Sequence, residues 1–217
     1  MQTRRDLAHW RIGGQPVTGI AVYMEGGGDS KEGKARLRQG MAEFLRKVVS
    51  QKKPGWKVVV CGSRNDAHDA FLNANQTWPE AFNVLLVDSE GPVSRPPSTH
   101  LKQRDGWNLA GASEESIHLM IQVMETWIIA DPDAVATYYD QHFIEKALPR
   151  AANLEGVEKE RIYKALKHAT AKTQKGEYHE IDHAAALLEK IDPAKVRRRC
   201  PSCDRLFIIL TQRTEAS

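Results

Sequence analysis

Residues 19–24 read Gly-Ile-Ala-Val-Tyr-Met, and three glycines follow shortly after, at positions 26–28. A short apolar run that is rich in β-formers and is ended by glycine predicts a buried strand. Asp29 or Ser30 can cap a helix after the glycines, because apolar side chains then recur at spacings of three and four. We expect this helix to run to about Val49.

Two more apolar runs, at residues 56–61 and 81–87, are separated by a helical pattern that starts near Ser63. Buried strands that alternate with helices are typical of a parallel sheet with helices on both faces. A proline-rich loop is expected after the third strand. Residues 117–124 predict a fourth strand, although their length would also suit a helix, and a helix is expected to begin near Glu125.

Helical periodicity dominates the second half of the chain, and no clear linker separates it from the first half. We therefore expect a single domain over residues 1–217, with an α/β core at about 19–140 and a helical C-terminal part at about 141–217. The apolar run at 206–210 would suit either an edge element or a closing helix. The expected fold class is α/β, with a mostly parallel, Rossmann-like sheet flanked by helices.

The composition is that of a globular protein, with 41% hydrophobic and 27% charged residues. No apolar run approaches the roughly 18 residues that cross a bilayer, and the polar N-terminus lacks the apolar segment of a secretion signal. The three cysteines, an odd number, cannot all pair in disulfides. We expect a cytoplasmic protein without a membrane partner.

Basic residues crowd the C-terminal part, although the formal net charge is only +3. Lys172, Lys175 and the run Arg197, Arg198 and Arg199 are the clearest examples. A surface of this kind can attract phosphates, so these residues are candidates for binding nucleic acid. The same residues would equally suit a helix face that contacts only water.

Acidic side chains follow the ends of three expected strands. Glu25 and Asp29 follow the first strand, Asp88 and Glu90 the third, and Glu125 the proposed fourth. Ligands of open parallel sheets bind beyond the carboxyl ends of the strands, where these side chains would converge. Like charges at close range repel one another unless a cation lies between them, and oxygen ligands favour Mg²⁺ or Mn²⁺. The alternative is that each acid only caps a helix or holds a turn.

Several short stretches resemble known sequences. Residues 24–29, Met-Glu-Gly-Gly-Gly-Asp, resemble the first motif of TOPRIM domains in the form found in overcoming-lysogenization-defect nucleases. Residues 86–91, Leu-Val-Asp-Ser-Glu-Gly, resemble the second TOPRIM motif. Residues 124–131 and 175–178 resemble a prokaryotic TOPRIM-like family of unknown function. The resemblance covers most of the chain, from about residue 19 to about residue 210.

The resemblance implies a TOPRIM fold and Mg²⁺-dependent cleavage or transfer of phosphodiester bonds in nucleic acid. By analogy with the family, Glu25 would be a general acid or base or a metal ligand, and Asp88 and Glu90 would hold the metal. Glu90 departs from the usual motif, which has aspartate at this place. The resemblance also implies a partner ATPase of ABC or AAA type in a module of antiphage defence.

A second interpretation of the glycine loop is that it binds a phosphate. With Gly27, Gly28 and Lys31, it could hold a phosphate at the N-terminus of the following helix. The loop fits neither the dinucleotide-binding fingerprint nor the P-loop spacing, so a free-standing nucleotide-binding module is the weaker reading. Within a TOPRIM site, the same loop could grip a phosphate of the substrate.

Two further alternatives stay open. Cys200 and Cys203, together with His179 and His183, could form a zinc site, although their order is inverted from that of a zinc finger. The chain could also be a degenerate TOPRIM domain that scaffolds or regulates an ATPase without catalysis. The sequence does not decide whether a substrate would be DNA, RNA or tRNA, or whether the chain forms a homo-oligomer.

Overall fold

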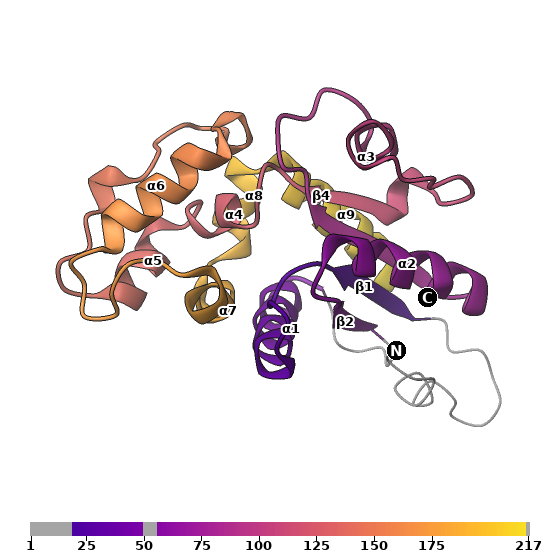
Figure 1. Cartoon of the computed structure of the whole chain (residues 1–217), viewed down its shortest axis with the longest axis horizontal. Helices are drawn as coiled ribbons and strands as arrows, with labels where there is room; N and C mark the ends of the chain where they lie inside the picture. Colours follow the sequence, from indigo (N-terminus) through magenta and orange to yellow (C-terminus); the bar gives the residue numbers. More distant parts are fainter. Residues whose placement is uncertain (1–18, 50–55, 216–217) are drawn as a thin grey trace.

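The computed structural model describes residues 19–49 and 56–215 (Figure 1). Within these residues, one sheet has four strands, all parallel, in the order β2-β1-β3-β4. The strands are β1 (Ile20–Met24), β2 (Trp56–Val60), β3 (Phe82–Asp88) and β4 (Ile117–Met120). β1 is buried throughout and β3 at all but its two ends, which explains why both appear in the sequence as continuous apolar runs. The expected α/β fold, a parallel Rossmann-like sheet flanked by helices, is confirmed.

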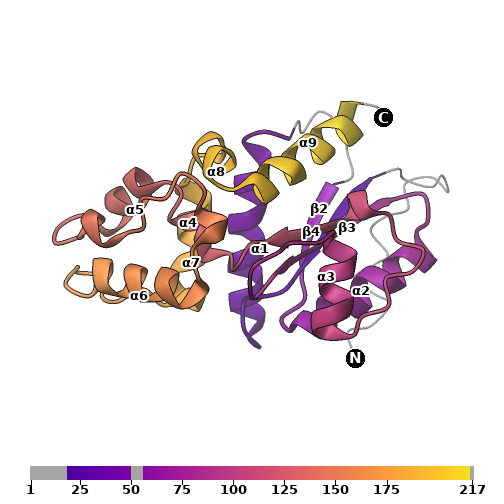
Figure 2. The ribbon, with the colours of Figure 1, turned by 90° about the horizontal axis from the view of Figure 1, so that it is seen from above.

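Helices cover both faces of the sheet (Figure 2). The covering helices are α1 (Lys31–Arg46), α2 (Arg64–Thr77), α3 (Pro97–Asp105) and α9 (Pro201–Glu215). α1 and α9 share one face, where the rings of Phe44 and Phe207 meet with their centroids 5.4 Å apart. α2 and α3 cover the opposite face through Phe71 and Leu101. The apolar core is therefore divided into two layers by the sheet.

The remaining helices form a helical part beyond the carboxyl ends of the strands (Figure 1). They are α4 (Glu125–Ile128), α5 (Pro132–Tyr139), α6 (Lys159–Thr170), α7 (Glu180–Lys190) and α8 (Pro193–Arg199). Short 3-10 turns at Glu145–Ala147 and Leu154–Gly156 lie between α5 and α6, and a third, at Glu114–Ser116, directly precedes β4. α7 packs along α1, and a Cβ atom on Gly40 of α1 would lie only 2.3 Å from the carbonyl oxygen of Ala185. Trp127 and Leu187 of the helical part belong to the same core as Phe44. The helical part and the sheet are thus joined by shared apolar packing.

The structure corrects two sequence predictions about helices and decides a third between its two alternatives. Residues 97–105, expected within a proline-rich loop, form α3, because Pro97 occupies the first turn of a helix, where its missing N–H is not needed. Residues 206–210, for which an edge element was one alternative, lie within the closing helix α9. α1 ends at Arg46, three residues before the predicted end at Val49.

The fourth strand is shorter than the sequence predicted. The apolar run continues to residue 124, but β4 ends at Met120. The chain then turns, and the carbonyl oxygen of Gln122 accepts a hydrogen bond of 2.8 Å from the N–H of Glu90. Val123 and Met124 lie beyond the strand but are buried in the core that the sheet shares with the helical part, which is why periodicity alone overestimated the length of the strand.

No helix in the described residues is long and apolar enough to cross a membrane.

Candidate functional site at the strand ends

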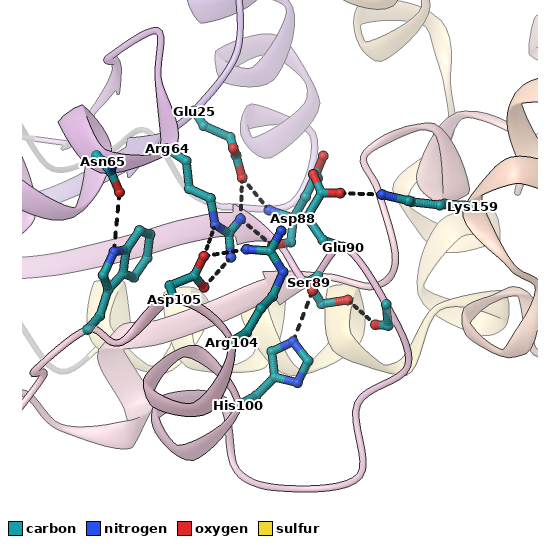
Figure 3. Close-up of polar contacts among 12 residues, drawn as sticks. Glu25, Arg64, Asn65, Asp88, Ser89, Glu90, His100, Arg104, Asp105 and Lys159 are labelled. Atoms are coloured by element: carbon teal, nitrogen blue, oxygen red, sulfur yellow. Dashed lines mark hydrogen bonds and ion pairs between the residues drawn. The ribbon is translucent and has the colours of Figure 1, made fainter.

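The carboxyl ends of β1 and β3 are joined by a side chain (Figure 3). Glu25 follows β1, and its Oε1 accepts a hydrogen bond of 2.7 Å from the backbone N–H of Asp88, the last residue of β3. The backbone pairing of these strands ends with Met24 beside Leu86. The Glu25 carboxylate therefore satisfies an N–H donor that lies just beyond the ladder. Burial raises the pKa of Glu25, although the nearby Arg64 and the Asp88 amide lower it.

A cation that the sequence analysis did not identify lies between the strand ends. Arg64 begins α2, and its Nη1 donates to Oε1 of Glu25 at 2.9 Å and to the backbone oxygen of Asp88 at 2.6 Å. Its Nε and Nη2 donate to the two carboxylate oxygens of Asp105 at 2.9 and 3.0 Å. Its guanidinium carbon lies 5.0 Å from the ring centre of Trp107. No local pattern marks Arg64 in the sequence, because its partners come from distant segments.

The side chain of Asp88 lacks such compensation. Its Oδ1 atom is buried and has no hydrogen-bond partner in the described part of the chain. Burial raises the pKa of Asp88 well above its ordinary value, and the negative charges of Glu25, Glu125, Glu90 and Glu180 add to the rise. This carboxylate therefore favours either a bound proton or a nearby cation.

Glu90 connects the turn after β3 to the helical part. Its backbone has a positive φ of 62°, and its Oε2 accepts a hydrogen bond of 2.7 Å from Nζ of Lys159 at the start of α6. The backbone N–H of Lys159 donates to the side-chain oxygen of Gln122 at 3.1 Å. From the other side, Nε2 of His100 lies 2.9 Å from the backbone oxygen of Ser89. The turn is thus held from both α6 and α3.

Glu125 is buried at the start of α4. The hydroxyl of Tyr178 donates a hydrogen bond of 2.7 Å to its Oε1. Burial raises the pKa of Glu125 to about 7, against the lowering effect of the Tyr178 hydrogen bond. The charge of Glu180 adds to the rise. Glu125 therefore changes its charge near neutral pH.

Glu180 is an acid of this cluster that the sequence analysis missed. It is the first residue of α7, and its charge acts on both Asp88 and Glu125. Only the folding of the helical part over the strand ends brings it there, so no strand-end pattern could reveal it. Asp29, which was a candidate, is exposed on the glycine loop, and no contact among the described residues joins it to the other acids.

The glycine loop is packed from two sides. Gly27 and Gly28 have φ of 77° and 63°, a region that glycine adopts readily and other residues rarely do. A Cβ atom on Gly27 would lie 2.8 Å from the Cα of Lys34, and one on Gly28 would lie 3.0 Å from the side chain of Ile181 in α7. Lys31 is exposed in the first turn of α1. Phosphate binding by this loop stays a prediction.

The basic residues proposed for nucleic-acid binding are not linked to the strand-end acids by any contact in the described residues. Lys172 and Lys175 are exposed after α6, and Nζ of Lys175 lies 5.2 Å from the ring centre of Tyr138. Arg197 forms an ion pair of 2.6 Å with an aspartate of α9, and Arg198 is exposed. The cations in contact with the acids are Arg64 and Lys159 instead.

Arg199 makes structural contacts. Its guanidinium donates to the backbone oxygens of Ile129, Ala130, Pro149 and Ala151 at distances of 2.9 to 3.4 Å. It therefore closes the C-terminal end of α4 and fastens α8 to the segment between α5 and α6.

The four candidate zinc ligands are not brought together. Cys200 and Cys203 are buried in the apolar core, whereas Nδ1 of His183 lies 2.9 Å from the hydroxyl oxygen of Tyr139, within hydrogen-bond distance. His179 is exposed just before α7. In the part of the chain that the structure describes, no three His, Cys, Asp or Glu side chains form a ready-made metal site.

Binding of a hydrated Mg²⁺ or Mn²⁺ by the acidic cluster stays a prediction. Mg²⁺ keeps several waters and commonly uses only one or two protein carboxylates together with substrate phosphates, so three converging ligands are not required. The buried, unpaired Oδ1 of Asp88 offers one such oxygen. Glu90 and Glu125 accept hydrogen bonds from Lys159 and Tyr178, so each would share its carboxylate between that donor and the ion.

Comparison with known proteins shows the family of the chain. The chain matches no curated protein and no solved structure. A family described as a domain of unknown function, DUF4276, matches residues 24–210. The matched stretch includes the strand-end acids as well as Tyr178 and Glu180. Because the match spans most of the chain, the protein belongs to the DUF4276 family.

Proposed function

We propose that this protein is a Mg²⁺-dependent enzyme that cleaves or transfers phosphodiester bonds in nucleic acid. The observation that carries the proposal is the buried, unpaired Oδ1 of Asp88, in the field of four other carboxylates. A carboxylate in such a field favours a divalent cation, and Mg²⁺ bound to carboxylates is a common partner of substrate phosphates. The resemblance of residues 24–29 and 86–91 to TOPRIM motifs supports the same chemistry.

The acids divide into two roles in this proposal. Asp88 would be the principal metal ligand and Glu90 the second, while Glu125 lies deeper, held by Tyr178. The ion, when bound, would neutralise charge on the scissile phosphate and lower the pKa of the attacking water. Glu25 would move a proton to or from the reacting oxygens, a role worth roughly 10²–10⁴-fold in rate.

The proposed partners follow from the same resemblance. Nucleic acid would be the substrate, and an ATPase of ABC or AAA type, in an antiphage defence module, would control when the site is used. The contact of Lys159 with Glu90 leaves this cation at the edge of the acidic cluster, where a substrate phosphate would also lie.

Metal binding can be tested without a substrate. We expect Mn²⁺ to raise the Tm of the wild-type protein, because an ion that binds only the folded state stabilises it by mass action. Asp88→Asn should abolish the rise and leave the metal-free protein as stable as the wild type or more so, since it removes a repelled charge. Asp29→Asn, which removes an exposed carboxylate nearby in the sequence, is the matched control and should keep the rise. Equal stabilisation in wild type and Asp88→Asn would refute metal binding at this site.

Catalysis requires a second experiment. Cleavage of DNA or RNA should stop with a chelator and fall at least about 100-fold in Glu25→Gln. The assay should use the complex with the ATPase if the isolated chain is inactive. Cleavage in that complex that survives both Glu25→Gln and Asp88→Asn would show that this chain is not the nuclease.

A regulatory scaffold is the second candidate function, and one observation favours it. Glu25 and Glu90, two of the acids that TOPRIM chemistry would need, are engaged by Arg64 and Lys159 in ion pairs of 2.9 and 2.7 Å. A degenerate domain would keep such pairs as permanent replacements for a metal. The two candidates differ in the Mn²⁺ experiment, because a scaffold of this kind shows no metal-dependent rise in Tm.

A further inference from the structure

We propose that Arg64 is a positioning residue that holds the Glu25 carboxylate in one orientation. In this arrangement, Oε1 is committed to hydrogen bonds and Oε2 is left for chemistry. The catalytic consequence rests on the proposed function, whereas the positioning itself rests only on the contacts of Arg64, Glu25 and Asp88.

The N–H groups of Arg64 are almost fully used within the protein. A guanidinium has five N–H groups. Four of those of Arg64 point at protein acceptors, namely both oxygens of Asp105, Oε1 of Glu25 and the backbone oxygen of Asp88. A substrate phosphate would have to break several of these bonds to engage Arg64. The geometry therefore favours a residue that orients its neighbours over one that grips a substrate.

The orientation of Arg64 is fixed from the far side. Asp105, the last residue of α3, receives the guanidinium through two nearly equal bonds, and Trp107 lies against the cation. Burial would raise the pKa of Asp105, but the hydrogen bonds and charge of Arg64 bring it below its usual value, so the carboxylate stays ionised. Two parallel hydrogen bonds between the planar guanidinium and a carboxylate fix the orientation of the arginine side chain as well as its distance. The ammonium group of a lysine cannot make this paired contact.

Two donors then converge on a single oxygen of Glu25. The backbone N–H of Asp88 and Nη1 of Arg64 both bond to Oε1, at 2.7 and 2.9 Å. Because the same Nη1 also bonds to the backbone oxygen of Asp88, the proposed proton-transfer group and the proposed metal ligand keep a fixed relation. The guanidinium thus connects the ends of β1, β3 and α3 through hydrogen bonds.

The amide proton of Asp88 reports this arrangement without any need for activity. Its chemical shift is measured by NMR on the ¹⁵N-labelled, metal-free protein. The Glu25→Gln variant gives the chemical shift of this amide proton when the charged acceptor is lost. We expect the signal in Arg64→Lys to move toward the Glu25→Gln position, because lysine keeps the charge and loses the fork. Asp105→Asn, which weakens the fork from its other end, should move it in the same direction.

Arg104→Lys is the matched control. Arg104 also pairs with Asp105, is more exposed than Arg64, and has no contact with Glu25 among the described residues. Its substitution should leave the Asp88 amide signal at the wild-type position. A wild-type signal in both Arg64→Lys and Asp105→Asn would overturn the proposal, and so would an equal movement in Arg104→Lys.

The activity of the assembled protein provides the second arm. Arg64→Lys should lower kcat at least about tenfold, because Glu25 is misplaced for proton transfer. KM and the Mn²⁺-induced rise in Tm should stay close to wild type. Loss of that rise, as expected for Asp88→Asn, would mean that Arg64 supports metal binding and would overturn the positioning role. If the wild-type complex cleaves nothing, the proposed function fails, and the amide signal alone decides the role of Arg64.

Discussion

The hydroxyl of Tyr178 donates a hydrogen bond of 2.7 Å to Oε1 of Glu125, and both residues are almost completely buried. The bond joins the segment before α7 to the first residue of α4, directly beyond the sheet. Burial favours the neutral form of a carboxyl group, and a hydrogen bond from a hydroxyl lowers the free-energy cost of the charged form. This contact therefore couples the protonation of Glu125 to the packing of the helical part.

Stability should depend on pH through Glu125. Its pKa is raised from 4.5 to about 7 in the folded protein. An acid whose pKa is higher in the folded than in the unfolded protein stabilises the folded state fully at pH values below its unfolded pKa. For Glu125 this stabilisation is lost as the pH rises from about 4.5 through 7. Relative to the wild type, Glu125→Gln should therefore gain stability over that window, on the order of 3 kcal/mol at most. Urea unfolding of both proteins between pH 5 and 8 measures the gain, and a difference that does not change with pH would contradict it.

Tyr178→Phe tests the same contact from the donor side. At pH 8, where Glu125 is charged, the loss of the hydroxyl should cost about 1.5–3 kcal/mol of unfolding free energy. The loss should shrink at pH 5, where the carboxyl group is neutral. Tyr138→Phe, in a half-buried ring nearby, is the control and should change stability by less than about 0.5 kcal/mol. Urea unfolding at the two pH values distinguishes the contact from general packing, which would give equal losses at both.

The close contact between α1 and α7 makes Gly40 sensitive to size. A Cβ atom at this position would lie 2.3 Å from the carbonyl oxygen of Ala185 and would force the two helices apart. Gly40→Ala should therefore lower the unfolding free energy by about 1–3 kcal/mol, although alanine alone favours helix formation. Gly156→Ala, with open space around the added carbon, should be close to neutral. A more stable Gly40→Ala protein in thermal or urea unfolding would be incompatible with this packing.

Two neighbouring arginines should differ sharply in their effects. Arg199→Ala removes a guanidinium from four backbone oxygens and should destabilise the protein by about 2–3 kcal/mol, because these oxygens lose a charged donor. Arg198→Ala, at an exposed position in the same basic run, should stay within about 0.5 kcal/mol of wild type. Urea unfolding measures both. Equal losses would mean that the run acts through its total charge and not through the contacts of Arg199.

The sequence predicted the sheet well and the site only in part. β1 and β3 are buried on both faces, so they appear as largely apolar runs, and the acids Glu25 and Asp88 at their ends could be identified. α3 was hidden because prolines are as typical of loops as of first helical turns. The length of β4 was overestimated because residues buried by helices and residues buried within a sheet are equally apolar in the sequence.

The missing parts of the site are those that only tertiary contacts define. Arg64, Tyr178 and Glu180 come from α2, from the segment before α7 and from α7 itself, and nothing in their local sequence points to a carboxylate elsewhere. The basic residues show a different limit, since counting charge cannot separate Arg199, which bonds to carbonyl groups, from Arg198, which is exposed. Nucleic-acid binding by Lys172, Lys175, Arg197 and Arg198 stays a prediction.

The acidic cluster combines early and late segments of the chain, because α7 packs against α1. The order of synthesis therefore decides when the cluster is complete. The ribosome releases β1 and its Glu25 early, whereas Tyr178 and Glu180 leave it only after the sheet, α3 and α6 have been made. Until then, Glu125 has no Tyr178 hydroxyl beside it, and the glycine loop lacks its cover from Ile181. A nascent chain therefore carries an incomplete cluster of acids until α7 has been made and has packed against α1.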